Sequence, residues 1–179
     1  MMSLSGAYVD QTTGMPPLAD IAVGLARIPR FGGQTVISWT VAEHLLAGMA
    51  YAAAPELQLY FGLHDVHEAM TSDVPTTFKT DDLRKIQASL DARLYASLGI
   101  PAPDWRVAEY VALLDRDMLL AEASVVCPPA TYGRIVAECG GREATLLHRV
   151  AVQTVLADPA PPADAWLTKI NTLLGKDKK

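Results

Sequence analysis

Residues 40–70 read TVAEHLLAGMAYAAAPELQLYFGLHDVHEAM, and this stretch decides the fold class. Its residues are mostly good helix formers, and the opening Thr-Val-Ala-Glu has the spacing of a capping box, which predicts a helix over 41–54. A second helix is predicted from Pro55 or Glu56 to Met70, because apolar side chains recur there at helical spacing. Two consecutive helices of this kind favour an all-α protein.

These two predicted helices carry residue types that bind metal ions. His44 lies in the first turn of the first helix, and the adjacent pair His64-Asp65 lies on the second. A later helix adds Asp115, which we prefer to Asp117 because it flanks the apolar stripe. Two imidazoles and two carboxylates offer nitrogen and oxygen ligands, which suit Zn, Co, Mn, Fe or Mg rather than a sulfur site. The ordered set therefore indicates a metal-dependent hydrolase.

Helical patterns cover most of the remaining chain, and no sustained alternation of polar and apolar residues indicates a strand. Asp20 is placed to cap a short helix that ends at Leu25, while Asp81 and Asp104 are placed to open two long helices. Pro and Gly residues follow each of these helices and predict where it ends. Further helices are predicted at roughly 131–139, 142–156 and in the last stretch that carries Trp166.

Length and composition indicate one all-α domain, 1–179, with an irregular N-terminal segment at 1–19 and a flexible tail at 175–179. Half of the residues are hydrophobic, but no apolar run approaches the roughly 20 residues of a membrane span. The first residues lack a basic and then apolar pattern, so no secretory signal is visible. We expect a soluble protein in the cytoplasm of a bacterium or of a phage-infected cell, without a membrane partner.

The net charge of −5 provides no basic field for DNA or RNA, so we expect no nucleic-acid partner. A ligand that carries phosphate would need positive charge close to the metal site. Arg27, Arg30, Lys79 and Lys85 are the candidates for that charge.

The order of these features resembles the HD-domain metal-dependent phosphohydrolases, specifically the branch of bacterial 5'-deoxynucleotidases and phage dATP triphosphohydrolases. The similarity spans roughly 20–123 and is strongest in the central block HDVHEAMTSDVPTTFK, which begins at His64. It also rests on RIPRFGG from Arg27, WTVAEH from Trp39 and DRDMLLAEA from Asp115. The resemblance implies an all-helical HD-domain bundle, a small-molecule deoxynucleotide substrate and a homo-oligomer.

By the resemblance, one or more divalent metal ions (Zn, Co, Mn or Mg) are held by His44, His64, Asp65 and Asp115. A bound cation lowers the pKa of water toward about 7, which makes hydroxide available at neutral pH. In this family the position of Glu68 orients or deprotonates the water, and the position of Asp73 assists the proton transfer.

Three further residues match substrate-binding positions of the family. Arg27 and Lys79 would neutralise the phosphate, as a forked donor and a point charge respectively. Trp39 matches an aromatic position that lines the sugar and base pocket, while packing in the core is the alternative for a tryptophan on this segment.

Two residues depart from the family pattern. Ile28 replaces the tryptophan of the monophosphatases, which favours hydrolysis of dATP to deoxyadenosine and triphosphate, with a 5'-deoxynucleotidase as the alternative. His67 occupies a position that is usually small, and we interpret it as a packed histidine or one that supports a ligand rather than as a fifth metal ligand, since a step of three residues turns it partly away from His64. A non-catalytic nucleotide-binding HD module is the remaining alternative, and the presence of Glu68 and Asp73 argues against it.

Overall fold

The computed structural model describes residues 1–10 and 12–176, and within these ranges the chain is all-helical, with isolated bridges and no β-strand. This confirms the predicted all-α class. The elements, in chain order, are α1 Leu18–Leu25, the 3₁₀ turn η1 Arg30–Gly33, α2 Val41–Tyr51, α3 Pro55–Leu63, α4 Glu68–Thr71, the 3₁₀ turn η2 Thr76–Phe78, α5 Asp81–Leu98, α6 Trp105–Val126, α7 Pro129–Glu138, α8 Leu146–Ala157 and α9 Pro162–Leu173.

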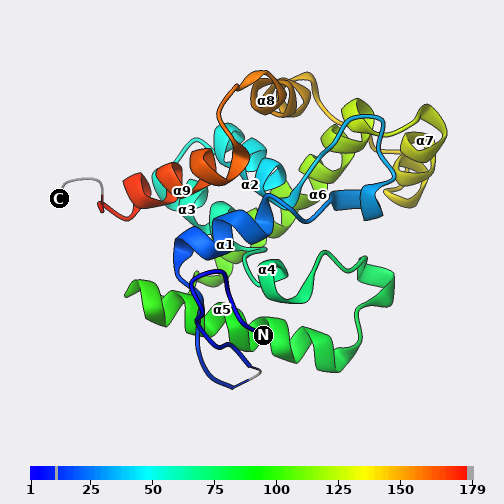
Figure 1. Cartoon of the computed structure of the whole chain (residues 1–179). Helices are drawn as coiled ribbons and strands as arrows, with labels where there is room; N and C mark the ends of the chain where they lie inside the picture. Colours follow the sequence, from blue (N-terminus) through cyan, green and yellow to red (C-terminus); the bar gives the residue numbers. More distant parts are fainter. Residues whose placement is uncertain (11, 177–179) are drawn as a thin grey trace.

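Helix α2 lies at the centre of the fold, packed against α3, α6, α8 and α9 (Figure 1). The predicted capping box is present: Thr40 accepts from the backbone N–H of Glu43, whose carboxylate accepts from the backbone N–H of Thr40. Such a cap contributes about 1 kcal/mol to helix stability. It fixes the first turn of α2, and with it the position of His44.

Helix α6 supplies the longest side of the core. Asp104 caps it by accepting from the backbone N–H groups of Arg106 and Val107, as predicted. Its buried face includes Leu114 and Met118, and it ends before the Pro128-Pro129 pair. The apolar residues that flank Asp115 thereby anchor this carboxylate against the core.

The predicted helix over 55–70 is interrupted, which corrects the sequence interpretation. Helix α3 ends at Leu63, and the chain then follows turns whose N–H groups bond three residues back, as from Val66 to Leu63 and from Glu68 to Asp65. Helix α4 resumes for a single turn. His64 and Asp65 therefore lie on a tight turn between two helices rather than on a helix face.

The predicted irregular N-terminal segment is observed up to Pro17, with α1 beginning at Leu18. Asp20 does not cap α1 but lies in its first turn, where it accepts hydrogen bonds from the backbone N–H and the hydroxyl of Ser5. The predicted tail falls partly at 177–179, outside the described residues. Over the described ranges no helix combines the length and apolar character needed to span a membrane.

Candidate metal centre

The structure brings the four predicted ligands together, with one donor atom of each within 4.8 Å of the others. Nε2 of His44 lies 3.3 Å from Asp115 Oδ1 and 3.7 Å from Asp65 Oδ2. Nε2 of His64 lies 3.2 Å from Asp65 Oδ2 and 3.8 Å from Asp115 Oδ1. Residues from α2, the turn after α3, and α6 thus converge on one point.

Both imidazoles are held through their other ring nitrogen. Nδ1 of His44 lies 2.5 Å from the buried Glu122 Oε1, and Nδ1 of His64 lies 2.7 Å from the carbonyl oxygen of Phe61. Each Nδ1 therefore carries the proton, which leaves the Nε2 lone pair directed at the common centre. Within the described chain neither buried Nε2 has a hydrogen-bond partner, as expected for atoms that ligate a cation. The cluster fits a divalent metal ion.

Arg30 adds a guanidinium behind the ligands. Its Nε lies 3.0 Å from Glu122 Oε2, and its Nη1 lies 3.7 Å from Asp65 Oδ2. The loop that carries it is closed by the backbone N–H of Arg30, which donates to the carbonyl of Trp39. Phe31 follows in the left-handed region with φ 55°, a conformation that is strained for a residue with a side chain. Arg30 and Glu122 therefore form a buried frame for His44 and Asp65.

The carboxylates and imidazoles shift one another's protonation. Burial alone would lower the pKa of His64, but the charges of Asp65 and Asp115 outweigh it and raise that pKa well above its ordinary value. Burial alone would raise the pKa of Asp65, and the His64 charge instead holds it well below the ordinary range. The pKa of Asp115 is lowered in the same way. A divalent cation would take the place of the proton between these groups.

A cavity of about 490 Å³ opens beside the cluster. Asp65 and Asp115 line it together with Glu68 and Asp73, while the Arg30 guanidinium and the Lys79 ammonium provide positive charge. Burial, together with the nearby carboxylates of Asp65 and Asp73, raises the pKa of Glu68 to about 9. Burial also raises the pKa of Asp73. The cavity combines cationic groups with two carboxyl groups whose pKa values are raised by burial.

A smaller cavity of about 300 Å³ borders His64 and Asp115 as well. It is lined by Tyr60 and Tyr95, whose rings meet edge to face at 6.0 Å, and by apolar residues of α6. The aromatic side chains and the apolar residues of α6 give this cavity an apolar wall for a flat ligand.

The structure places three predicted residues elsewhere. Arg27 is exposed and lines a different hollow near Met1, so Arg30 and not Arg27 supplies the guanidinium of the site. Trp39 is buried in the core and does not line either cavity beside the cluster, which supports the packing alternative. Asp117 pairs with Arg142 at 2.7 Å and is not among the clustered residues, whereas Asp115 is.

Sequence reasoning did not assign a role to Glu122 or Asp91. Glu122 follows Asp115 by seven residues, a spacing that places both on one side of a helix and was a usable signal. Nδ1 of His67 lies 2.9 Å from Oδ1 of Asp91 on α5, at hydrogen-bond distance. No local pattern connects residues 67 and 91, since their contact depends on how α5 docks.

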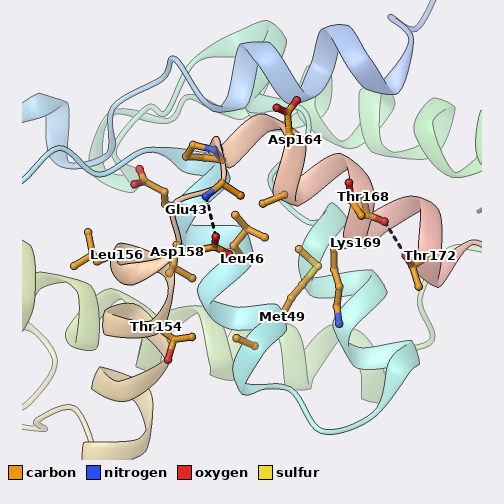
Figure 2. Close-up of a pocket in the computed structure, with 15 residues that line it drawn as sticks. Glu43, Leu46, Met49, Thr154, Leu156, Asp158, Asp164, Thr168, Lys169 and Thr172 are labelled. Atoms are coloured by element: carbon orange, nitrogen blue, oxygen red, sulfur yellow. Dashed lines mark hydrogen bonds between the residues drawn. The ribbon is translucent and has the colours of Figure 1, made fainter.

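A larger cavity, of about 620 Å³, lies between α2, α8 and α9 and is shown in Figure 2. Leu46 and Met49 line its floor, and the Asp164 and Lys169 side chains stand at its rim. It contains none of the four clustered ligands and no histidine. The potential metal ligands therefore border the two smaller cavities and not this one.

The chain matches no protein-family model and no curated protein sequence.

Proposed function

We propose that this chain is a metal-dependent phosphohydrolase that acts on 2'-deoxynucleotides and converts dATP to deoxyadenosine and triphosphate. The observation that carries the proposal is the four-ligand cluster with two orphaned imidazole nitrogens, facing a cavity that also holds Arg30 and Lys79. The sequence resemblance supplies the substrate class. A cytoplasmic location and a homo-oligomeric assembly belong to the same proposal.

A divalent cation at the cluster would supply Lewis acidity, which lowers the pKa of water and neutralises charge on phosphate oxygens. The side chains of the cavity would bind the phosphate and transfer protons. Lys79 and Arg30 both line this cavity; Lys79 would bind a phosphate oxygen, and Arg30 would add positive potential. Glu68 and Asp73 line the path on which the attacking water loses its proton and the leaving oxygen gains one.

The aromatic cavity extends the proposal to the base. Asp115 borders both cavities, so a nucleotide whose phosphate lies near Lys79 would place its base toward Tyr60 and Tyr95. The Asp115 side chain is 42 % exposed, which leaves the cluster open to a ligand from this side. A phosphoester bond would then lie against the metal ligands.

A product assay tests the proposal. The Mn²⁺- or Co²⁺-loaded protein is incubated with dATP, dAMP and the matching ribonucleotides, and nucleoside, phosphate, pyrophosphate and triphosphate are separated. We expect deoxyadenosine and triphosphate in equal amounts from dATP. Phosphate release from dAMP alone would identify a 5'-deoxynucleotidase, and absence of turnover with metal bound would leave a nucleotide-binding module.

A further inference from the structure

A second group of potential ligands lies directly beside the first. One donor atom each of Asp65, His67 and Glu68 fall within 4.8 Å of one another. Asp65 belongs to both groups, while His67 and Glu68 are not among the four ligands of the first. The tight turn after α3, with its bonds three residues back, brings these side chains to one side of the chain.

His67 is held in the same way as His44. Its Nδ1 lies 2.9 Å from Asp91 Oδ1, just as Nδ1 of His44 lies beside Glu122. The His67 side chain is only 9 % exposed, and its buried Nε2 has no hydrogen-bond partner in the part of the chain that the structure describes. A carboxylate on one ring nitrogen and a free lone pair on the other is the arrangement of a metal-ligating histidine.

Glu68 offers a second unsatisfied atom. The residue is 2 % exposed, and Lys79 Nζ approaches only its Oε1, at 3.7 Å. The other oxygen, Oε2, is buried and finds no donor among the described residues. A buried polar atom without a partner is unfavourable. A cation bound between His67 Nε2 and Glu68 Oε2 would satisfy both atoms.

The charge around the two groups points the same way. Even when each histidine and Glu68 are counted as neutral, carboxylates outnumber the cationic side chains Arg30 and Lys79. These carboxylates belong to Asp65, Asp73, Asp91, Asp115 and Glu122. One divalent ion would leave this excess only partly compensated. Asp65 has two carboxylate oxygens, and Oδ2 is the one that faces His44 and His64.

We infer that the chain binds a second divalent cation through His67 Nε2, Glu68 Oε2 and the carboxylate of Asp65, which bridges the two ions. The nitrogen and oxygen ligands suit Mn²⁺, Co²⁺ or Zn²⁺. Bridged ions in two-metal sites lie about 3.5–4 Å apart and act together on a phosphate. This inference deepens the proposed function, on whose first metal site it rests.

Metal stoichiometry and spin coupling test the inference. The full chain is loaded with Mn²⁺, freed of excess metal, and examined by elemental analysis and electron paramagnetic resonance. We expect two Mn²⁺ per chain and the broad spectrum of an exchange-coupled pair. One ion per chain with a six-line spectrum overturns the second site.

Variants then assign the second ion to its ligands. His67→Phe removes Nε2 in nearly the same volume, and His67→Asn keeps a group that can reach Asp91; each should bind one Mn²⁺ and lose the coupling. Asp82→Asn, an exposed carboxylate on α5, is the matched control and should retain two. Two coupled ions in both His67 variants would refute the assignment. If one variant fails to fold, the wild-type spectrum and the other variant still decide.

Turnover separates this inference from the proposed function. Two coupled ions without hydrolysis of any deoxynucleotide would uphold the second site and refute the proposed activity. Hydrolysis of dATP with a single bound ion would refute the second site and uphold the proposed activity.

Discussion

Neighbouring residues of helix α2 face two different regions of the molecule. His44 points into the metal cluster, while Glu43 lines the larger cavity of Figure 2 between α2, α8 and α9. The cavity of Figure 2 has a volume of about 620 Å³, and the cavity beside the cluster about 490 Å³. By size alone the first would be the better candidate for a site.

The polar groups separate the two cavities. In the cavity of Figure 2, Glu43 is bonded to Thr40 and Asp158 accepts from the backbone N–H of Ala160. None of the described residues that line it has a buried polar atom without a partner. Beside the cluster, several buried nitrogens and oxygens lack one. Unsatisfied polar atoms, rather than volume, distinguish the region beside the cluster from the cavity of Figure 2.

The largest effect is expected from removing a ligand. Asp115→Asn should lower dATP turnover roughly 10³-fold, about 4 kcal/mol of activation free energy, because a neutral amide is a poor metal ligand. Stability without metal should change little, since the side chain is 42 % exposed. Steady-state kinetics with the metal-loaded protein measures the loss.

Asp164→Asn is the matched control in the cavity of Figure 2, where the side chain stands at the rim. Its turnover should equal that of the unmodified chain. If Asp164→Asn lost activity and Asp115→Asn kept it, the active site would have to lie in the cavity of Figure 2 rather than beside the cluster.

The next effect is on stability and compares two glutamates. Glu122→Ala should destabilise the fold by about 3 kcal/mol, because it leaves the Arg30 guanidinium and the His44 N–H buried without their main acceptor. Glu43→Ala removes only the reciprocal half of a helix cap and should cost about 1 kcal/mol. Urea unfolding monitored by circular dichroism, without metal, measures both. Equal losses would show that Glu122 is no more than a packed side chain.

The sequence was sufficient to predict the parts of the fold that depend on local chemistry. The capping box at Thr40 and the cap at Asp104 are both observed, and the helix that begins at Asp81 ends at Gly99 in the left-handed conformation. Helices predicted from such signals position His44 and Asp115 correctly. The clustering of the four ligands also follows, although from the order of motifs rather than from any single one.

What could not be predicted depends on tertiary contacts. Gly62 precedes the break after Leu63, but a single glycine inside a helical pattern does not by itself predict where the helix ends. The break is associated with contacts such as the bond from His64 Nδ1 to the Phe61 carbonyl oxygen. The sequence predicted Arg27 beside the ligands, but Arg30 lies there. The position of Arg30 depends on a loop in which Phe31 adopts a positive φ, which this residue type disfavours. The support of His67 by Asp91 requires α5 to dock across the turn.

A moderate effect is expected from packing on the two sides of α2. A side chain at Gly48 would collide with the ring of Phe61, whose carbonyl holds His64. Gly48→Ala should therefore cost about 2 kcal/mol and weaken Mn²⁺ binding. Ala50→Leu, a larger change on the exposed side that lines the cavity of Figure 2, should cost less than Gly48→Ala. Thermal unfolding and Mn²⁺ titration of both variants check this order.

The smallest effect concerns backbone strain, which also differs between the two cavities. Among the described residues other than glycine, positive φ occurs at Phe31 and Ser72, each next to a residue that lines the cavity beside the cluster. Ser72, with φ 65° and ψ 163°, adopts a conformation that is almost restricted to glycine.

Ser72→Gly should therefore raise stability by about 0.5–1 kcal/mol, because relief of strain exceeds the entropy that glycine loses on folding. The neighbouring Asp73 would be held less firmly, so turnover should fall modestly while Mn²⁺ affinity stays unchanged. Ala160→Gly, in the loop beside the cavity of Figure 2, should have the opposite sign and destabilise by about 0.5 kcal/mol without affecting turnover. Denaturant titration measures the change in the free energy of unfolding of each variant. A loss of stability in Ser72→Gly would mean that the Ser72 backbone carries no strain. The position of Asp73 would then depend on its side-chain contacts alone.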